Sequence, residues 1–259
     1  MELPFDILDH IFSFLKSHPK ALLACSKAHP ILSQTIERHR FHRIIIHTGT
    51  RVADYRYGFK PSDLLKHVTE TPRITKYVAI LQIGSNDSNE IAPYLEEIAS
   101  LLPMFPLLEC IVLPTHPKSA LLWQNLPQSF RTAVENCLHL PTLQEVHVGN
   151  LSFPLSLLDD HPNINSLSLS GPPKAESEYL ETTYPQIKSL SFEGFEHHYS
   201  NVVRTWAKRH ILELQSLKYD LSCHRLILEV LQTCSNTLEN LYLCLQRRGT
   251  PCELSYRLM

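Results

Sequence analysis

Histidine and cysteine are abundant enough in this sequence to raise the question of a metal site. The 259 residues include 15 His and 7 Cys, and these side chains supply the nitrogen and sulfur ligands that zinc prefers. Zinc ligands usually come in pairs a few residues apart, with a second pair nearby. The best candidates, His39 with His42 and the adjacent His197 and His198, have no second pair close in sequence. We therefore predict no metal site and no cofactor.

Motifs for covalent or phosphate chemistry are also missing from the sequence. The chain contains no G-x-S-x-G nucleophile turn, and neither of the glycine-rich patterns G-x-x-x-x-G-K-[ST] and G-x-G-x-x-G. Without such a motif, nothing in the chain predicts a nucleophile or a cradle for phosphates. We therefore expect that the protein is not an enzyme and has no catalytic residues.

Composition and charge exclude further classes of partner. The formal net charge is −2, which gives no excess of positive charge for a nucleic acid or an anionic lipid surface. No apolar run reaches the roughly 20 residues of a membrane span, and no secretion signal opens the chain. The cysteines are odd in number and form no C-x-x-C pair, which predicts reduced thiols. We expect a cytoplasmic or nuclear protein that binds neither nucleic acid nor membrane.

Residues 5–15 are predicted to form a helix with an unusually wide apolar face. At roughly 100° per residue its apolar side chains cover about half of the circumference, whereas a helix on a globular surface needs a stripe only a little wider than about 100°. We expect another surface to cover the excess. The apolar residues of this helix are Phe5, Ile7, Leu8, Ile11, Phe12, Phe14 and Leu15.

Two more helices and a strand are predicted directly after it. Segments 19–26 and 30–39 both open with proline, which suits the first turn of a helix because its missing N–H would have no partner there. Segment 41–46 is apolar and β-branched without a helical period, which indicates a strand.

The segments LPFDILDHIFSFL, ALLACSKAHPIL and FHRIII together resemble an F-box, and the match covers about residues 2 to 46. One departure is Ala28-His29-Pro30, in a region where many F-boxes have Trp. The residues that match the family pattern are Leu3, Pro4, Asp6, Ile7, Leu8, Ile11, Phe12, Phe14, Leu15, Cys25, Ser26 and Lys27.

This resemblance implies a partner. F-box proteins bind the Skp-family adaptor of cullin-based ubiquitin ligases through the opening Leu-Pro and the first helices, so it implies contact with that adaptor and through it with a cullin. Carried over residue by residue, the implied adaptor-binding residues are Leu3, Pro4, Ile7, Leu8, Ile11, Phe12 and Leu15. The alternative is that this face packs entirely on the rest of the chain.

A repeat of the form L-x-x-L-x-L runs through residues 47–259. Its first anchors recur at intervals of roughly 21 to 35 residues, close to the period of about 20 to 29 residues of leucine-rich repeats, in which each unit holds one strand. The anchors are Val78/Leu81/Ile83, Leu108/Ile111/Leu113, Leu143/Val146/Val148, Ile164/Leu167/Leu169, Ile187/Leu190/Phe192, Leu214/Leu217/Tyr219 and Leu238/Leu241/Leu243, with Phe41/Ile44/Ile46 one step earlier.

Helices are expected between several of these strands. The helical patterns cover residues 62–70, 90–102, 120–138 with a break at Pro127, 200–208 and 223–234. The predicted fold is therefore α/β: a three-helix F-box over residues 1–46, then an irregular leucine-rich-repeat solenoid with a parallel sheet over residues 47–259.

Residues between the anchors should line one face of that sheet, because side chains alternate along a strand. This face would be small, polar and rich in serine. The residues on it that we single out as possible contacts to a protein target are Glu145, His147, Glu193, Lys218, Asp220 and Tyr242.

The sequence thus predicts the substrate-recognition subunit of a Skp/cullin/F-box ubiquitin ligase, which holds an unknown protein substrate and has no chemistry of its own. One alternative is a non-catalytic leucine-rich-repeat scaffold whose vestigial F-box only caps the repeats. Another is a metal- or thiol-dependent enzyme, which bound zinc would reveal.

Overall fold

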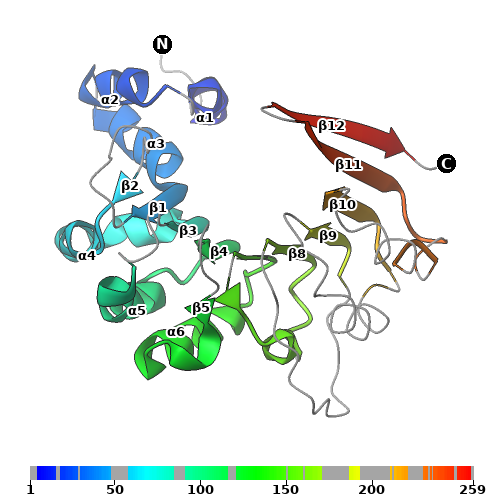
Figure 1. Cartoon of the computed structure of the whole chain (residues 1–259). Helices are drawn as coiled ribbons and strands as arrows, with labels where there is room; N and C mark the ends of the chain where they lie inside the picture. Colours follow the sequence, from blue (N-terminus) through cyan, green and yellow to red (C-terminus); the bar gives the residue numbers. More distant parts are fainter. Residues whose placement is uncertain are drawn as a thin grey trace.

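The computed structural model has helices at the N-terminal end and a large, mainly parallel sheet in the rest of the chain (Figure 1). The protein is therefore a mixed α/β protein. The residues that the structure describes are 5–15, 18–28, 30–47, 58–84, 91–115, 121–149, 151–159, 161–170, 187–192, 211, 213–220, 230–232, 234, 236–247 and 250–257.

Three helices form the N-terminal part: α1 (Phe5–Phe14), α2 (Pro19–Ala28) and α3 (Pro30–Phe41). They confirm the three helices that the sequence predicts. The helices enclose a small core of their own, made by Phe12, Leu22 and Ile36, with partly buried apolar side chains packed around it. Because this core is separate from the core of the sheet, the three helices bury some of their apolar surface without using the rest of the chain.

The large sheet contains nine parallel strands among the described residues, and one antiparallel strand at its edge. Its order is β12-β11-β10-β9-β8-β6-β4-β3-β1-β2, with β12 antiparallel to β11. The strands are β1 (Arg43–His47), β2 (Gly58–Phe59), β3 (Ile80–Gly84), β4 (Cys110–Thr115), β6 (Glu145–Val148), β8 (Ser166–Leu169), β9 (Ser189–Phe192), β10 (Ser216–Asp220), β11 (Asn240–Arg247) and β12 (Thr250–Arg257).

The repeat predicted from the sequence coincides with these strands. The second anchor of each unit lies opposite the second anchor of the next across all eight strands from β1 to β11 that carry the pattern. These anchors are Ile44, Leu81, Ile111, Val146, Leu167, Leu190, Leu217 and Leu241. All but the partly buried Leu241 are 0 or 1% exposed, so the leucine-type positions form one continuous buried row.

Two boundaries differ from the sequence-based expectation. The strand expected over 41–46 begins at Arg43, because α3 continues through Phe41. The boundary that we expected after residue 46 falls inside β1, which pairs with β2 and β3 of the large sheet. The first strand therefore belongs to the sheet, and α3 leads into it directly.

Backbone hydrogen bonds join each unit to the next at the start of the strands. The carbonyl oxygen of the residue just before a strand accepts hydrogen bonds from two backbone N–H groups of the next unit, with N···O distances of 2.8 to 3.1 Å. The two donors are the residue just before the next strand and the first residue of that strand. For example, the Gln144 carbonyl accepts from Asn165 and Ser166, and the Asn165 carbonyl accepts from Lys188 and Ser189. The other carbonyls of this ladder are those of His42, Ala79, Glu109, Lys188 and Gln215.

Threonine side chains reinforce this ladder in two units. Thr142 Oγ1 donates to the Leu108 carbonyl at 2.8 Å, and Thr237 Oγ1 donates to the Leu214 carbonyl at 2.9 Å. Each threonine directly precedes the first anchor of its own unit and bonds the first anchor of the unit before. The same contact thus recurs at equivalent positions.

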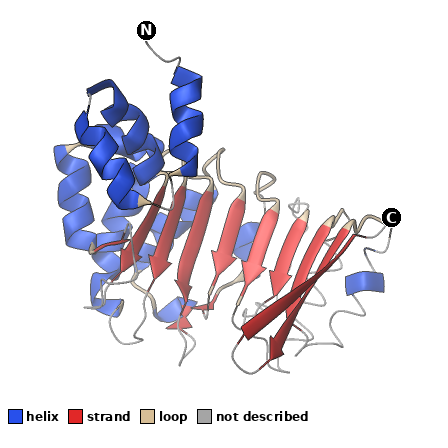
Figure 2. Cartoon of the chain, turned by 90° about the horizontal axis from the view of Figure 1, so that it is seen from above, coloured by secondary structure: helices blue, strands red, loops and turns tan. Residues whose placement is uncertain are grey.

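Helices lie on the outer side of the arc that the strands follow (Figure 1), and Figure 2 shows the strands side by side. Pro127 separates η5 from α6, as predicted, because proline cannot donate within a helix. The outer elements are α4 (Pro61–Glu70), η2 (Pro72–Tyr77), η3 (Ala92–Tyr94), α5 (Leu95–Leu101), η4 (Leu102–Met104), η5 (Trp123–Asn125), α6 (Gln128–Leu138), η6 (Leu155–Leu158) and the two-stranded sheet of β5 (Leu121–Leu122) and β7 (Leu151–Ser152).

The remaining helix predictions have different outcomes. The helices expected over 62–70 and 120–138 correspond to α4 and to η5 with α6, and α5 with its flanking 3-10 turns covers most of 90–102. The helix expected over 200–208 lies outside the described residues, as does most of the one expected over 223–234. Among the described helices, none is both long and apolar enough to cross a membrane.

Candidate functional site: a serine-lined groove

A groove of about 420 Å³ runs over the inner face of the sheet, from β4 to β11. Its floor follows from the alternation of side chains along β8 and β9, whose sequences SLSL and SLSF point leucine or phenylalanine into the core and serine into the groove. Because serine side chains are small, the groove face of β8 and β9 is lower than the parts of the sheet that carry larger side chains. The serines of this groove are Ser166, Ser168, Ser170, Ser189, Ser191 and Ser216.

Strand register arranges the polar groove residues in two rows. In the first row Cys110, Glu145, Ser166, Ser189 and Ser216 lie opposite one another on successive strands. The second row consists of Val112, His147, Ser168, Ser191, Lys218 and Tyr242. Serine hydroxyl groups therefore occupy both rows on β8 and β9, with Glu145 and His147 beside them on β6 and with Lys218 beside Ser191 on β10.

Four of the six residues predicted to contact a target line this one groove: Glu145, His147, Lys218 and Tyr242. Of the other two, Glu193 lies outside the described residues, and Asp220 ends β10 but its side chain is not described. The alternation argument thus brings together the residues that the structure allows us to check, at positions up to 97 residues apart in the chain, from 145 to 242.

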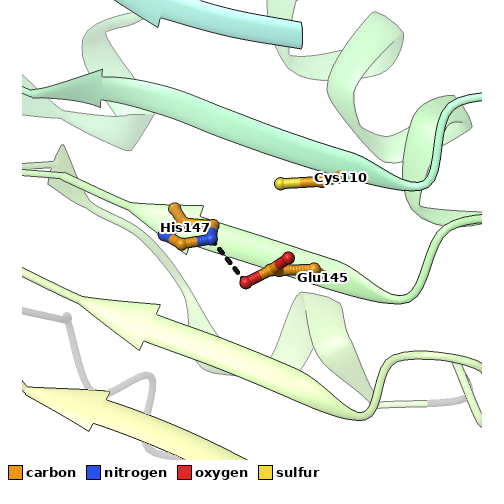
Figure 3. Close-up of side chains that lie close together, drawn as sticks. All are labelled: Cys110, Glu145 and His147. Carbon is orange, nitrogen blue, oxygen red and sulfur yellow. Dashed lines mark hydrogen bonds and ion pairs between the residues drawn. The ribbon is translucent and has the colours of Figure 1, made fainter. Parts of the chain in front are cut away.

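Cys110, Glu145 and His147 form a cluster at one end of the groove, which we call the Cys–Glu–His cluster (Figure 3). The His147 Nε2 and Glu145 Oε1 atoms are 2.8 Å apart, and the Ser166 hydroxyl donates to the same carboxylate oxygen at 3.4 Å. The thiol, carboxylate and imidazole donor atoms all lie within 4.8 Å of one another. Cys110 is buried, whereas the other two are half-buried.

The electrostatics of the cluster follow from these contacts. The hydrogen bond from His147 lowers the pKa of the Glu145 carboxyl, assisted by the imidazole charge and opposed by partial burial. Burial, followed by the nearby Glu145 charge, raises the pKa of the Cys110 thiol from 9.0 to about 12. At neutral pH the cluster therefore holds a carboxylate and a protonated thiol.

This arrangement does not make Cys110 a nucleophile. A catalytic cysteine needs a neighbouring cation that favours its thiolate, but here the carboxylate of Glu145 raises the thiol's pKa. Cys137, buried in α6, also has its pKa raised to about 12, in this case by burial alone.

We expect Cys110 and Cys137 to resist alkylation in the native protein. With a pKa of about 12, each thiol has roughly one thousandth of the thiolate of an ordinary cysteine near neutral pH. Cys25 is only partly buried, so a maleimide should label it before Cys110 and Cys137. Peptide mapping by mass spectrometry checks the order, with urea-unfolded protein as the control in which all three react. Labelling of Cys110 as fast as Cys25 would contradict the assignment.

Of the histidines that the sequence analysis weighed as metal ligands, His39 and His42 do not belong to this cluster. His39 lies in the helical part, where its Nε2 is 3.0 Å from Asp9 Oδ1, and His197 and His198 lie outside the described residues. Sequence reasoning missed the Cys–Glu–His cluster because its members are 35 residues apart, at 110 and 145. The signal was nevertheless present, since Cys110 and Glu145 each directly precede the second anchor of their unit.

The second candidate surface is the outer face of α1. Ile7, Ile11 and Phe14 are 44, 43 and 69% exposed, and their spacing of four and three residues places them on one side of the helix. Leu23 of α2 is also exposed, at 41%. The molecule thus has an apolar surface on its N-terminal helices, which precede β1 in the chain.

The residues predicted to contact an adaptor separate into three groups. Ile7 and Ile11 are on the exposed face, whereas Phe12 is only 4% exposed and fills the helical core, with Leu8 and Leu15 packed against it. Leu3 and Pro4 lie outside the described residues. Phe12 is therefore inaccessible to a partner, and Phe14, which the prediction omitted, is accessible.

Comparison of the chain with protein-family models, with curated proteins and with solved structures finds no match.

Proposed function

We propose that the protein is the substrate-recognition subunit of a Skp/cullin/F-box ubiquitin ligase in the cytoplasm or nucleus. In this proposal α1, α2 and α3 are an F-box that docks on a Skp-family adaptor, and the sheet with its outer helices is a leucine-rich-repeat solenoid that recruits a protein target. The ligase would gain rate from proximity, because the target is held near a ubiquitin-charged partner. The chain itself would not be an enzyme.

The observation that carries the proposal is the exposed apolar face of α1. Side chains of Ile, Leu and Phe are usually buried, and a cluster of them on one helix side marks an interaction surface. Here Ile7, Ile11 and Phe14 stay exposed although Phe12, on the same helix, is buried. The first helix of an F-box needs two apolar sides, because one packs in the core of the F-box and the other contacts the adaptor.

The scaffold alternative predicts a different environment for the apolar face of α1. If a vestigial F-box only capped the repeats, its apolar face would be covered by the rest of the chain. The exposure of Ile7 at 44% and Ile11 at 43% favours docking on a separate protein.

The regularity of the sheet supports a solenoid. Each unit adds one parallel strand, and the outer side carries α or 3-10 turns, which is how leucine-rich repeats are built. A curved sheet with an open inner face is a common binding surface in such proteins, and the serine-lined groove lies on that face.

Binding to a purified Skp-family adaptor tests the proposal. The full chain and the adaptor, mixed at micromolar concentration, are expected to co-elute in size-exclusion chromatography and to give a dissociation constant by calorimetry. The isolated adaptor and an unrelated leucine-rich-repeat protein serve as controls. A folded wild-type chain that does not bind the adaptor would refute the adaptor role.

A further inference from the structure

We propose that Cys110, Glu145 and His147 bind a divalent cation of the zinc type, with an open coordination position that faces the serine-lined groove. The proposal concerns the groove and does not depend on the ubiquitin-ligase role. Within the residues that the structure describes, these three are the one group of thiol, carboxylate and imidazole donors close enough to share an ion.

The donor set suits zinc. Zinc accepts thiolate sulfur, imidazole nitrogen and carboxylate oxygen, and sites with three protein ligands keep a fourth position for water or a bound group. The mixture of one soft donor and two harder donors disfavours calcium and magnesium, which prefer oxygen ligands alone. The cluster thus offers one ligand of each type that zinc uses.

The geometry requires only small side-chain movements. Donor atoms in a tetrahedral zinc site are about 3.5 Å apart, given metal–ligand bonds of about 2.0 to 2.3 Å, and the three donors here already lie within 4.8 Å. The backbone positions are held by strand pairing, with Cys110 opposite Glu145 and His147 two residues further along β6. The His147 Nε2 atom, which would bind the ion, already points at Glu145 (Figure 3).

Charge also favours a cation at this point. When the thiol releases its proton to bind an ion, the thiolate and the Glu145 carboxylate carry two negative charges, which a divalent cation balances. The positive charge of Arg43 opposes this effect, because it lowers the pKa of Cys110; the Arg43 guanidinium donates to Gln82 at 2.6 Å. Lys218 lines the same groove three strands away from β6 in the sheet order, on β10.

The open position has a consequence for the groove. Glu145 and His147 line the groove, and the buried Cys110 lies opposite Glu145 on the neighbouring strand, so a bound ion would present its fourth position to the groove rather than to the core. An anionic or imidazole group of a bound partner could then displace the water on the ion.

Metal titration of the full chain tests this site. The chelator-treated protein is titrated with Zn²⁺ and, separately, with Co²⁺, whose thiolate charge-transfer absorption in the near ultraviolet reports a cysteine ligand. We expect one ion per chain with that absorption. Cys110→Ser should remove the absorption, and both Cys110→Ser and His147→Gln should weaken binding at least about hundredfold, because each deletes one of three ligands. Cys137→Ser, which changes another buried cysteine, should leave both measurements unchanged.

Several outcomes would overturn the proposal. One is that the wild-type protein binds no ion, in which case the cluster is only an ion pair with a hydrogen-bonded thiol. Another is a Co²⁺ spectrum without thiolate absorption. If Cys110→Ser does not fold, His147→Gln decides, because the His147 side chain is 35% exposed and its replacement should not unfold the sheet. Unchanged affinity in His147→Gln would overturn the site.

Discussion

Replacing Ile7 and Ile11 together by Asp is expected to abolish binding of the Skp-family adaptor while the sheet stays folded. Both side chains are more than two-fifths exposed, so the free protein loses little when they change. In the complex, each buried isoleucine contributes on the order of 1.5 to 3 kcal/mol, and an unpaired carboxylate in its place adds a desolvation cost. Together these effects predict that the adaptor binds at least about a thousandfold more weakly.

The double variant needs a control that changes an equally exposed apolar residue elsewhere. Leu107→Asp is suitable, because Leu107 is 46% exposed and lies just before β4, within the part of the chain that forms the sheet. Calorimetry should show wild-type adaptor affinity for Leu107→Asp, and circular dichroism should show native spectra for both variants. Wild-type affinity in the Ile7→Asp, Ile11→Asp variant would place the adaptor contact elsewhere.

The second large effect is expected in the row of buried anchors. Leu167→Ala should lower the free energy of unfolding by about 2 to 5 kcal/mol, because it removes buried apolar contacts and leaves a cavity that the surrounding core fills only in part. Leu167 is 1% exposed and lies between Val146 and Leu190 in the sheet. Urea denaturation followed by circular dichroism measures the change.

The neighbouring residue provides the matched control. Ser168 follows Leu167 on β8 but points into the groove, where it is partly exposed, so Ser168→Ala should change stability by less than about 0.5 kcal/mol. Equal losses for Leu167→Ala and Ser168→Ala would contradict the assignment of the two faces of β8.

The strands were predictable because large apolar residues recur at fixed positions within each unit. The apolar side chains of anchors such as Val146 and Leu167 are buried in the core. Because side chains alternate along a strand, Glu145 and His147 then lie on the opposite face. The four groove residues that we singled out as possible target contacts follow from this rule alone. The end of α3 was less predictable, because Phe41 is apolar and suits the end of a helix as well as the start of a strand.

Two features depend on contacts that no local pattern contains. The Cys–Glu–His cluster requires the register between β4 and β6, which is set by pairing across 35 residues, from 110 to 145. The division of α1 into a buried side at Phe12 and an exposed side at Phe14 depends on where α2 and α3 pack. A helix that is apolar over half its circumference does not itself reveal which part faces its own core.

The carbonyl ladder at the strand starts has a consequence for how this protein can change over evolutionary time. Each bond of the ladder uses atoms next to a strand and none from the connections on the outer side. Insertions and deletions in those connections should therefore leave the groove unaltered, since they do not enter the bonds that align one unit with the next. Whole units could likewise be duplicated or lost, and the groove would lengthen or shorten by one strand each time.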